Sequence, residues 1–308
     1  MDINRLRPEK WKDHPENPII EPPFPEFLIG DPTVVLPSES PDGKWHLFAN
    51  TLLGIHHYEG VDGIHFKRVS RLFPGMRAFV FCEERRYFMF YEEFKFPMLR
   101  SRIVMRESQD LVNWTNPSQI LEPELSWEVG RVAKTCGNPC LVKDKSGNYR
   151  LYYSANLVFL KDLGFCEPKF IGVAKAEDIR GPYSKFQHPI ISPSFDDSYR
   201  NKGAGAIKVI FDEKEGLYIG FNNGIYEDES GKTRSAILLL TSEDGMDWKD
   251  SFENPIIAPE GAGWKRGLVY QLDIKRVGDE FMLWYNARSG WRFAKERIGL
   301  ATARIEPE

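Results

Sequence analysis

The sequence predicts an all-β protein, a five-bladed β-propeller with four antiparallel strands in each blade. Three recurring patterns predict it: aliphatic segments that end in proline, pairs of strands joined by a tight turn, and acidic turns followed by an aromatic residue. Patterns that recur in the same order along a chain indicate a repeat architecture. We therefore assign one blade to each copy.

The proline-ended segments are expected to form the fourth, outermost strand of each blade. Proline cannot donate to a strand ladder, so it is confined to strand ends and edges. The five copies lie at residues 16–22, around Leu72-Phe73-Pro74, and at 118–123, 187–193 and 253–259.

Five further segments are in register with each other and are expected to form the first, innermost strands. They span residues 30–35, 76–81, 137–142, 204–209 and 270–275. Each is followed by an aromatic segment, the expected second strand, at residues 45–49, 87–91, 149–153, 217–221 and 281–285. Turns such as Pro41-Asp42-Gly43-Lys44 between them are typical of hairpins.

An acidic turn before an aromatic residue is expected to connect the third strand to the fourth. The clearest copy is 242–248, Ser-Glu-Asp-Gly-Met-Asp-Trp, with others at 61–66 and 108–114 and a looser one at 176–183. We expect Trp114 and Trp248, which end two of these copies, to be packing anchors.

The repeat spacing predicts how the propeller closes. Asn138, Gly205 and Gln271, at equivalent positions, are 67 and 66 residues apart, whereas only 37 residues follow Gln271. The 30 residues before Asp31 would complete the last blade. Asn17-Pro18-Ile19-Ile20 is therefore expected to supply its outermost strand, which removes a free sheet edge. No linker composition divides the chain, so we expect a single domain over residues 1–308.

Composition excludes several classes of function. The net charge of −4 gives no electrostatic basis for binding nucleic acid or an anionic membrane. No apolar run approaches the ~20 residues of a membrane span, and the N-terminus is polar. The four cysteines lack zinc-type or secreted-disulfide spacing, so we expect free thiols and a cytoplasmic protein. No motif indicates a metal or another cofactor.

The heads of the first strands are the first candidates for a site, because these strands line the central channel of a propeller. Asp31, Arg77, Asn138, Gly205 and Gln271 occupy equivalent positions there. Four of the five are polar, and they could bind a ligand, cap strands or hold channel water.

The blade pattern, Asp31-Pro32 at the head of blade one and the Ser-x-Asp-Gly-x-x-Trp phrase resemble the five-bladed glycoside hydrolases. These include family 43, the related families 32, 62 and 68, and the family 130 mannoside phosphorylases. The resemblance covers the whole chain and implies carbohydrate as the partner. In family 43 it implies carboxylates at the heads of blades one, three and four, with Asp31 as the base. Here Asn138 and Gly205 stand at the other two positions.

Other residues are expected to complete the site. Glu92 and Glu93 follow the second strand of blade two, and alternation would turn one of them inward as the acid. We expect Arg77, Asn138, Lys202 and Gln271 to orient the substrate. Asp273, Arg288 and Trp291 are further candidates for substrate binding, each with a structural alternative: ion pairing for Asp273 and Arg288, and packing for Trp291.

Three functions follow from these candidates. The first is a glycosidase that binds a sugar in the channel, with Asp31 as base and Glu92 or Glu93 as acid. The second is a sugar-binding propeller without turnover, which the residues at 138 and 205 favour. The third is a family 130-like phosphorylase, in which Arg77, Lys202, Lys208 and Arg288 would gather near the channel to bind phosphate.

Overall fold

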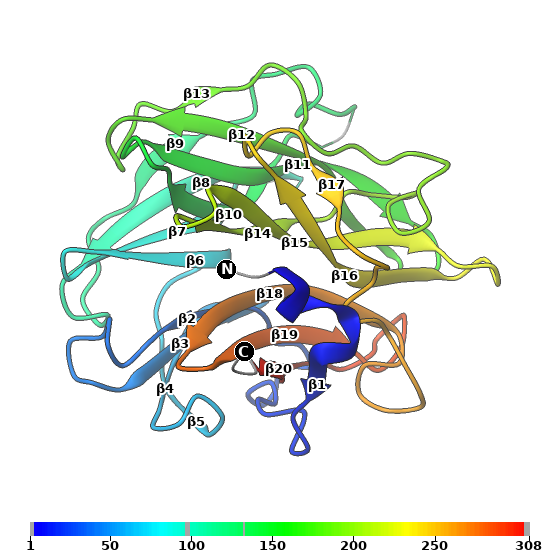
Figure 1. Ribbon diagram of the computed structural model, residues 1–308, viewed down its shortest axis with the longest axis horizontal. Helices are drawn as coiled ribbons and strands as arrows, with labels where there is room; N and C mark the ends of the chain where they lie inside the picture. The colour runs from blue at the N-terminus through cyan, green and yellow to red at the C-terminus, as the bar shows by residue number, and fades with distance from the viewer. Residues whose placement is uncertain (1–2, 96–98, 132, 305–308) are drawn as a thin grey trace.

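The five sequence units form five four-stranded antiparallel sheets in a computed structural model that describes residues 3–95, 99–131 and 133–304. The first strands contact one another in a ring: β2 touches β18 and β6, β6 touches β10, β10 touches β14, and β14 touches β18. This arrangement is the predicted five-bladed propeller (Figure 1).

The strands keep the predicted order within each blade. Blade one holds β2 (Gly30–Val35), β3 (Trp45–Thr51), β4 (Gly54–Gly60) and β5 (Phe66–Arg71); blade two holds β6 (Met76–Glu83), β7 (Arg86–Lys95), β8 (Arg100–Ser108) and β9 (Ser118–Leu121); blade three holds β10 (Cys136–Lys143), β11 (Tyr149–Leu160), β12 (Phe165–Ala176) and β13 (Ser184–Lys185); blade four holds β14 (Ile207–Asp212), β15 (Leu217–Glu227), β16 (Thr233–Ser242) and β17 (Lys249–Asp250); blade five holds β18 (Leu268–Val277), β19 (Glu280–Arg288), β20 (Glu296–Arg304) and β1 (Trp11–Asp13).

The N-terminal segment closes the last blade, as the spacing predicted. Two short 3-10 helices, η1 (Ile3–Leu6) and η2 (Pro8–Lys10), lead into β1, which pairs with β20. In Figure 1 this dark blue segment lies beside the orange and red strands of blade five. The strand is Trp11–Asp13 rather than the expected 17–20, although Ile20 still bridges to Ile298.

The same correction applies to most of the other fourth strands. In blades one, three and four the regular strand ends before the proline-ended segment, while in blade two β9 lies inside it. In blades three and four the segment makes only an isolated bridge to the third strand, Ile191 to Ile171 and Ile257 to Ile237. Each bridge is flanked by prolines, Pro189 and Pro193 or Pro255 and Pro259, which lack the N–H that a longer ladder would need.

Aromatic residues pack one blade against the next. Trp114 meets Phe48 of blade one edge to face, with ring centres 6.0 Å apart, and Trp248 meets Tyr152 of blade three in the same way at 6.0 Å. Both tryptophans are the packing anchors that the acidic turns predicted. The four cysteines are free, and Cys136 and Cys140 are buried in the core, as expected.

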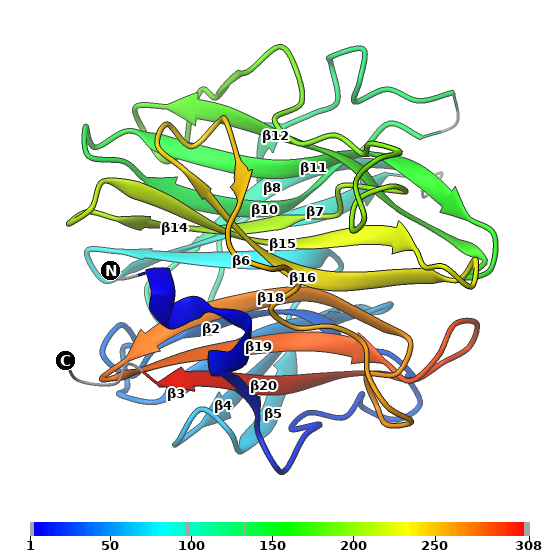
Figure 2. The ribbon, with the colours of Figure 1, turned by 45° about the vertical axis from the view of Figure 1, so that its right-hand side comes forward.

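The hairpins between second and third strands project from one side of the propeller. Figure 2 shows the β11–β12, β15–β16 and β19–β20 hairpins, in green, yellow and red, reaching out on the same side.

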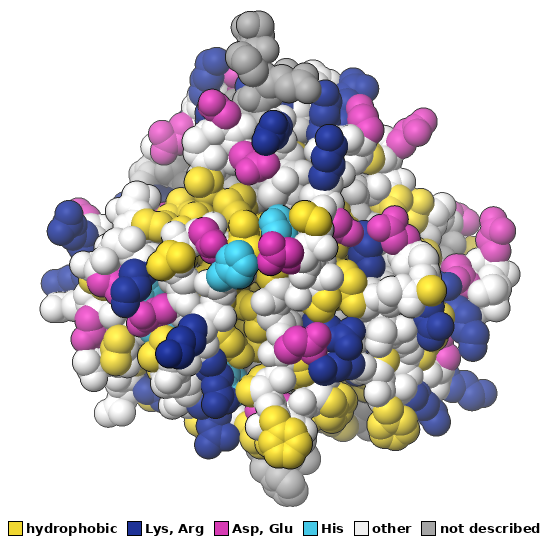
Figure 3. Space-filling model, turned by 90° about the horizontal axis from the view of Figure 1, so that it is seen from below, with side chains coloured by type: hydrophobic (Ala, Val, Ile, Leu, Met, Phe, Trp, Pro, Cys, Tyr) yellow, Lys and Arg dark blue, Asp and Glu magenta, His cyan; other side chains and the backbone are white. Residues whose placement is uncertain are grey.

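On the face in Figure 3, basic and acidic side chains lie interspersed. Across the described ranges, no helix combines the length and the apolar character that crossing a bilayer requires.

Candidate functional site in the channel mouth

Three polar residues stand at the heads of the first strands, where the backbone leaves the regular ladder. Asp31, Arg77 and Asn138 have φ values of 55°, 56° and 49°. The pairing of each first strand with its second strand shifts register at the same place. Such bulges redirect a side chain, and left-handed non-glycine residues cluster at functional sites. The starts of the first strands of blades one to three therefore have the backbone geometry expected of a functional site.

Blade four cannot offer a side chain at this position. Gly205 also has a positive φ, of 66°, and a Cβ placed on it would lie 1.9 Å from the carbonyl oxygen of Asn223. Only glycine fits so close to another backbone. In blade five, Gln271 is buried and its Nε2 donates to Oδ1 of Asn138 at 3.3 Å.

In each blade a polar residue stands five positions after the first residue of the predicted second strand, and several of these residues hydrogen-bond the starts of first strands. Oδ1 of Asn286 accepts the backbone N–H of Asp31 at 3.0 Å, and Oδ1 of Asn50 accepts that of Arg77 at 2.5 Å. The pattern is visible in the sequence as Asn50, Glu92, Ser154, Asn222 and Asn286. It is the signal by which sequence analysis would have found Asn50 and Asn286.

The heads open into a cavity of about 400 Å³ at the end of the channel where the hairpins project. Its polar lining comes from first strands, second strands and hairpins: Asp31, Asn50, Arg77, Asn138, Glu167, Asn223, Tyr270, Gln271, Asn286, Arg288 and Glu296. Five of the predicted site residues are thereby brought together, namely Asp31, Arg77, Asn138, Gln271 and Arg288.

The alternation expected of Glu92 and Glu93 is present, but neither residue lines the cavity. Glu92 is buried, and its Oε2 accepts from Nη1 of Arg77 at 2.7 Å. Glu93 lies on the other face of β7 and pairs with Arg102 at 2.7 Å. Glu92 therefore pairs with Arg77, which lines the cavity, without lining the cavity itself. This position does not support a role for Glu92 as the acid.

Three other expected residues lie outside this cavity. Lys202 pairs with Glu227 at 2.7 Å. Trp291 lies in the loop between β19 and β20, where its indole N–H donates to the carbonyl oxygen of Thr233 at 2.9 Å. The structure thus corrects the expected grouping of Lys202 and Trp291 with the channel residues.

Asp273, the third of these residues, has a structural position. Its Oδ2 accepts the backbone N–H of Val34 at 2.6 Å, and its Oδ1 accepts that of Ile274 at 2.9 Å. The bond from Val34 joins blade one to blade five, whereas the bond from Ile274 lies within β18. Asp273 and Lys208 line a separate hollow that does not include Asp31.

Two carboxylates that sequence analysis missed do line the cavity. Glu167 lies near the start of β12, and Glu296 is the first residue of β20. Both come from the third strands rather than the first, so the register of the first strands gave no indication of them. Oε1 of Glu296 accepts from Nδ2 of Asn286 at 2.6 Å, and its Oε2 lies 3.2 Å from Nε of Arg288.

The cavity favours protonated carboxyl groups at neutral pH. Burial raises the pKa of Glu167 to about 7 and that of Glu296 to about 7, although Arg288 opposes both shifts. Burial also raises the pKa of Asp31, against the opposing charge of Arg77. Three carboxyls thus share two guanidiniums, one of which is also paired with Glu92, so at least one carboxyl is expected to keep its proton.

A Gly137→Ala variant should disturb the support of this cavity. A Cβ at Gly137 would lie 2.0 Å from Oε2 of Glu92, so the Glu92–Arg77 pair would have to move. Overpacking a core and disturbing a buried ion pair cost about 3 kcal/mol. Chemical denaturation should show this loss, whereas Gly263→Ala, where a Cβ meets nothing within 4 Å, should leave the unfolding free energy unchanged. Equal stability of the two variants would contradict the placement of Glu92.

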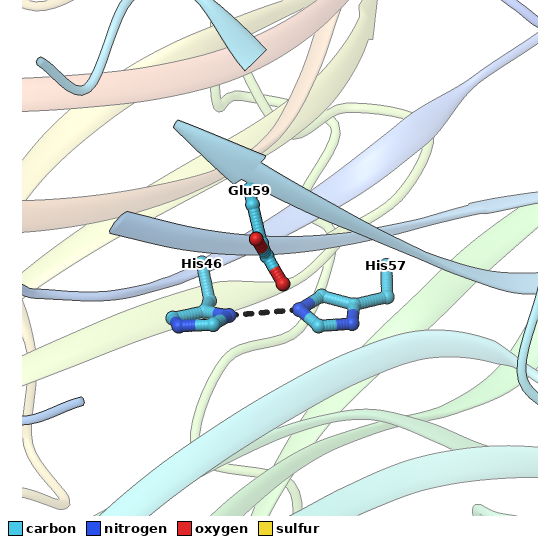
Figure 4. Close-up of side chains that lie close together, drawn as sticks. All are labelled: His46, His57 and Glu59. Carbon is cyan, nitrogen blue, oxygen red and sulfur yellow. Dashed lines mark hydrogen bonds between the residues drawn. The ribbon is translucent and has the colours of Figure 1, made fainter. Parts of the chain in front are cut away.

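His46, His57 and Glu59, on β3 and β4, form the one cluster of potential metal ligands within the described ranges (Figure 4). None of the three lines the cavity. Nδ1 of His46 lies 2.8 Å from Nε2 of His57, and Nε2 of His46 lies 2.8 Å from Oδ1 of Asp42. Two ligand nitrogens of tetrahedral zinc are about 3.3 Å apart, from Zn–N bonds of ~2.0 Å. The 2.8 Å between the two imidazole nitrogens therefore fits a hydrogen bond between His46 and His57 better than a metal ion bound by both.

This cluster predicts sensitivity to acid. Burial lowers the pKa of His57 to about 4 from its ordinary 6.5, so the unfolded chain binds a proton in this range that the folded protein does not. The stability that neutral His57 contributes is therefore lost as pH falls from 6.5 to 4, by up to about 3 kcal/mol. A His57→Gln variant keeps a donor for His46 but cannot titrate, and its unfolding free energy should fall less over this range. Identical pH profiles would contradict the account.

Comparison with known proteins shows likeness at the level of structure only. No protein-family model and no curated protein matches the sequence. Among solved structures, the catalytic domain of the Coprinopsis cinerea family 62 α-L-arabinofuranosidase is similar with a TM-score of 0.70 and 15% identity over 96% of both chains. A thermostable family 43 glycoside hydrolase gives a TM-score of 0.62 and 15% identity over 88% of both chains.

A third similar structure belongs to the family 130 mannoside phosphorylases. Its description states that this family contains glycoside hydrolases that target β-1,2-mannosidic linkages in Candida mannan. Its TM-score is 0.68, with 16% identity over 96% of both chains. The predicted resemblance to the five-bladed glycoside hydrolases is thus confirmed, and identities this low establish a shared fold rather than a shared reaction.

Proposed function

We propose that the protein is a carbohydrate-active enzyme of the glycosidase type and that the cavity at the channel mouth holds its sugar. The observation that carries the proposal is the convergence of Asp31, Glu167 and Glu296 on one cavity. Glycoside cleavage commonly needs two carboxyl groups in different protonation states. Amide and guanidinium groups surround the three carboxyls, and such groups suit the hydroxyls of a sugar.

Asp31 is the base in this proposal and Glu167 is the acid. Asp31, ionised, takes a proton from a water molecule that attacks the anomeric carbon. The bond from that carbon to the leaving oxygen breaks, and Glu167 gives its proton to this oxygen. Glu296 is less suited to the proton transfer, because Asn286 and Arg288 already hold its two oxygens.

Burial raises the pKa of Glu167 despite Arg77, Arg288 and the hydroxyl of Tyr270, each of which lowers it. Glu167 interacts electrostatically with Arg77 and Arg288 but forms an ion pair with neither in the described part of the chain. A carboxyl without a fixed ionic partner retains a proton more easily. Burial and the lack of an ion pair therefore support Glu167 as the proton donor.

The test is release of the aglycone from a panel of methyl and 4-nitrophenyl glycosides of arabinofuranose, xylose and mannose. Turnover of one member without phosphate would support the proposal. Turnover that depends on phosphate would instead identify a phosphorylase. Proton NMR of the first-formed sugar should show inversion at the anomeric carbon if Asp31 activates water directly.

A sugar-binding protein without turnover is the second candidate. The observation in its favour is that Asn138 and Gly205 occupy the two positions where the family 43 resemblance implies carboxylates. Such a protein would bind members of the panel in calorimetry and release no product. Its affinity would be insensitive to Glu167→Gln beyond the loss of a single contact.

A further inference from the structure

The cavity is polar at its floor and apolar toward solvent. The carboxyl, amide and guanidinium groups come from the first and second strands and from residues close to the β11–β12 and β19–β20 turns, while the remaining lining includes Phe27, Leu28, Leu52, Met76 and Phe165. We call Phe27, Leu28, Leu52 and the adjacent Leu53 the apolar shelf. Phe27, Leu52 and Leu53 are 44%, 57% and 53% exposed.

The apolar shelf is held rigidly beside the carboxyls. The backbone N–H of Glu296 donates to the carbonyl oxygen of Phe27 at 3.1 Å, and Leu28 bridges to Glu296 in parallel. The turn that carries Leu53 is tied to the same segment, because its N–H donates to Oε2 of Glu26 at 3.4 Å. The backbone of Glu296, whose carboxyl group lines the cavity, therefore fixes the position of the shelf.

Phe165 lies on the cavity wall contributed by blade three. The guanidinium of Arg288 lies over its ring, 4.9 Å from the centre. Phe165 and the shelf belong to segments distant in sequence, and both line this cavity. A ligand that leaves the polar floor toward solvent therefore passes apolar side chains contributed by blade three and by the shelf.

We infer that the leaving group of the natural substrate is apolar, an aryl or alkyl aglycone rather than a second sugar. This inference rests on the proposed function. A second sugar would need hydrogen-bonding partners where it leaves the floor, and the shelf offers leucine and phenylalanine. An apolar aglycone would remove these exposed side chains from water, which is favourable in proportion to the area buried.

The test is the rate of cleavage of methyl, butyl, hexyl and octyl glycosides of the sugar that the panel identifies. These leaving groups have similar intrinsic reactivity, so the trend in kcat/KM reports on burial. A fully buried methylene is equivalent to roughly fourfold and a half-buried one to about twofold. We expect about a twofold gain per methylene, until the chain extends beyond the shelf. A flat or falling series, or a disaccharide cleaved better than the octyl glycoside, would overturn the inference.

A pair of variants connects the trend to the shelf. Leu52→Ser should lower kcat/KM for the octyl glycoside several times more than for the methyl glycoside, which flattens the alkyl series. Val112→Ser removes a side chain of similar exposure, 54%, outside the cavity, and should keep the series unchanged. A series that is equally steep in both variants would contradict the assignment.

Two further outcomes are distinguishable. If no glycoside is cleaved, the same alkyl series is measured as affinity by calorimetry; a rise with chain length supports an apolar subsite even though the proposed function has failed. If the parent forms dimers with rising concentration and Leu52→Ser does not, the shelf binds a second copy of the chain, and the inference is wrong.

Discussion

An Asp31→Asn variant is expected to fold as the parent does and to lose about 10²- to 10⁴-fold in turnover, the usual contribution of acid or base assistance. Asparagine has the same shape and tolerates the left-handed backbone, where Asp31 has a φ of 55°. The backbone bond from residue 31 to Asn286 does not involve the carboxylate. The measurement is kcat on the best glycoside of the panel, with circular dichroism to confirm folding.

The matched control is Glu93→Gln. It removes a carboxylate that pairs with Arg102 on the outer face of β7, so turnover should stay within about twofold of the parent. Stability offers a second readout for Asp31→Asn, because its charge adds to those that raise the pKa of Glu167 and Glu296. The variant should therefore be no less stable than the parent. Turnover within tenfold of the parent would remove Asp31 from the mechanism.

A Glu167→Gln variant is expected to lose cleavage in a way that depends on the leaving group. An alkoxide is a poor leaving group and needs a proton in the transition state, whereas 2,4-dinitrophenolate does not. We expect a loss of about 10²- to 10⁴-fold on alkyl glycosides and less than tenfold on 2,4-dinitrophenyl glycosides. Equal losses on both would assign Glu167 to binding or folding rather than to proton donation.

The difference in stability between Glu167→Gln and the parent should also depend on pH. The folded protein keeps the Glu167 proton up to about pH 7, whereas the unfolded chain loses it near 4.5. The folded state therefore binds more protons across this range, and the unfolding free energy of the parent falls as pH rises. Glutamine does not titrate. The unfolding free energy of Glu167→Gln relative to that of the parent should therefore rise between pH 4.5 and 8, by up to about 3 kcal/mol.

Glu93→Gln again serves as the control, since its pair with Arg102 is partly exposed and its replacement should give no such trend. Thermal melts of the three proteins across this pH range provide the measurement. A difference between Glu167→Gln and the parent that is constant with pH would show that Glu167 is not buried as described.

The fold was predictable because each blade repeats local signals. Aromatic second strands, tight turns and prolines depend on neighbours in sequence, and five copies agree on one register. The outermost strands were placed less well, because their position depends on pairing with the third strand. Strands β1 and β17 end at Asp13 and Asp250, five residues before Pro18 and Pro255, and beyond these prolines Ile20 and Ile257 make only isolated bridges.

The site was predictable only in part. Asp31, Arg77, Asn138 and Gln271 were found because they occupy the repeat position that faces the channel. Glu167 and Glu296 were missed because they enter the cavity from third strands, at places that the repeat does not mark. Alternation predicted that one of Glu92 and Glu93 would face inward without deciding which, and no sequence pattern showed that Arg77 would lie between Glu92 and the cavity.

A crystal structure of the Asp31→Asn variant with an uncleaved glycoside from the panel tests the central proposal most directly. The account predicts the sugar at the floor of the cavity, with its glycosidic oxygen within hydrogen-bonding distance of Glu167. It also predicts the substituted amide at position 31 on the opposite face of the ring, with ~6.5–9.5 Å between the side chains of residues 31 and 167. A sugar bound outside this cavity, or one whose glycosidic oxygen meets neither residue, would contradict it.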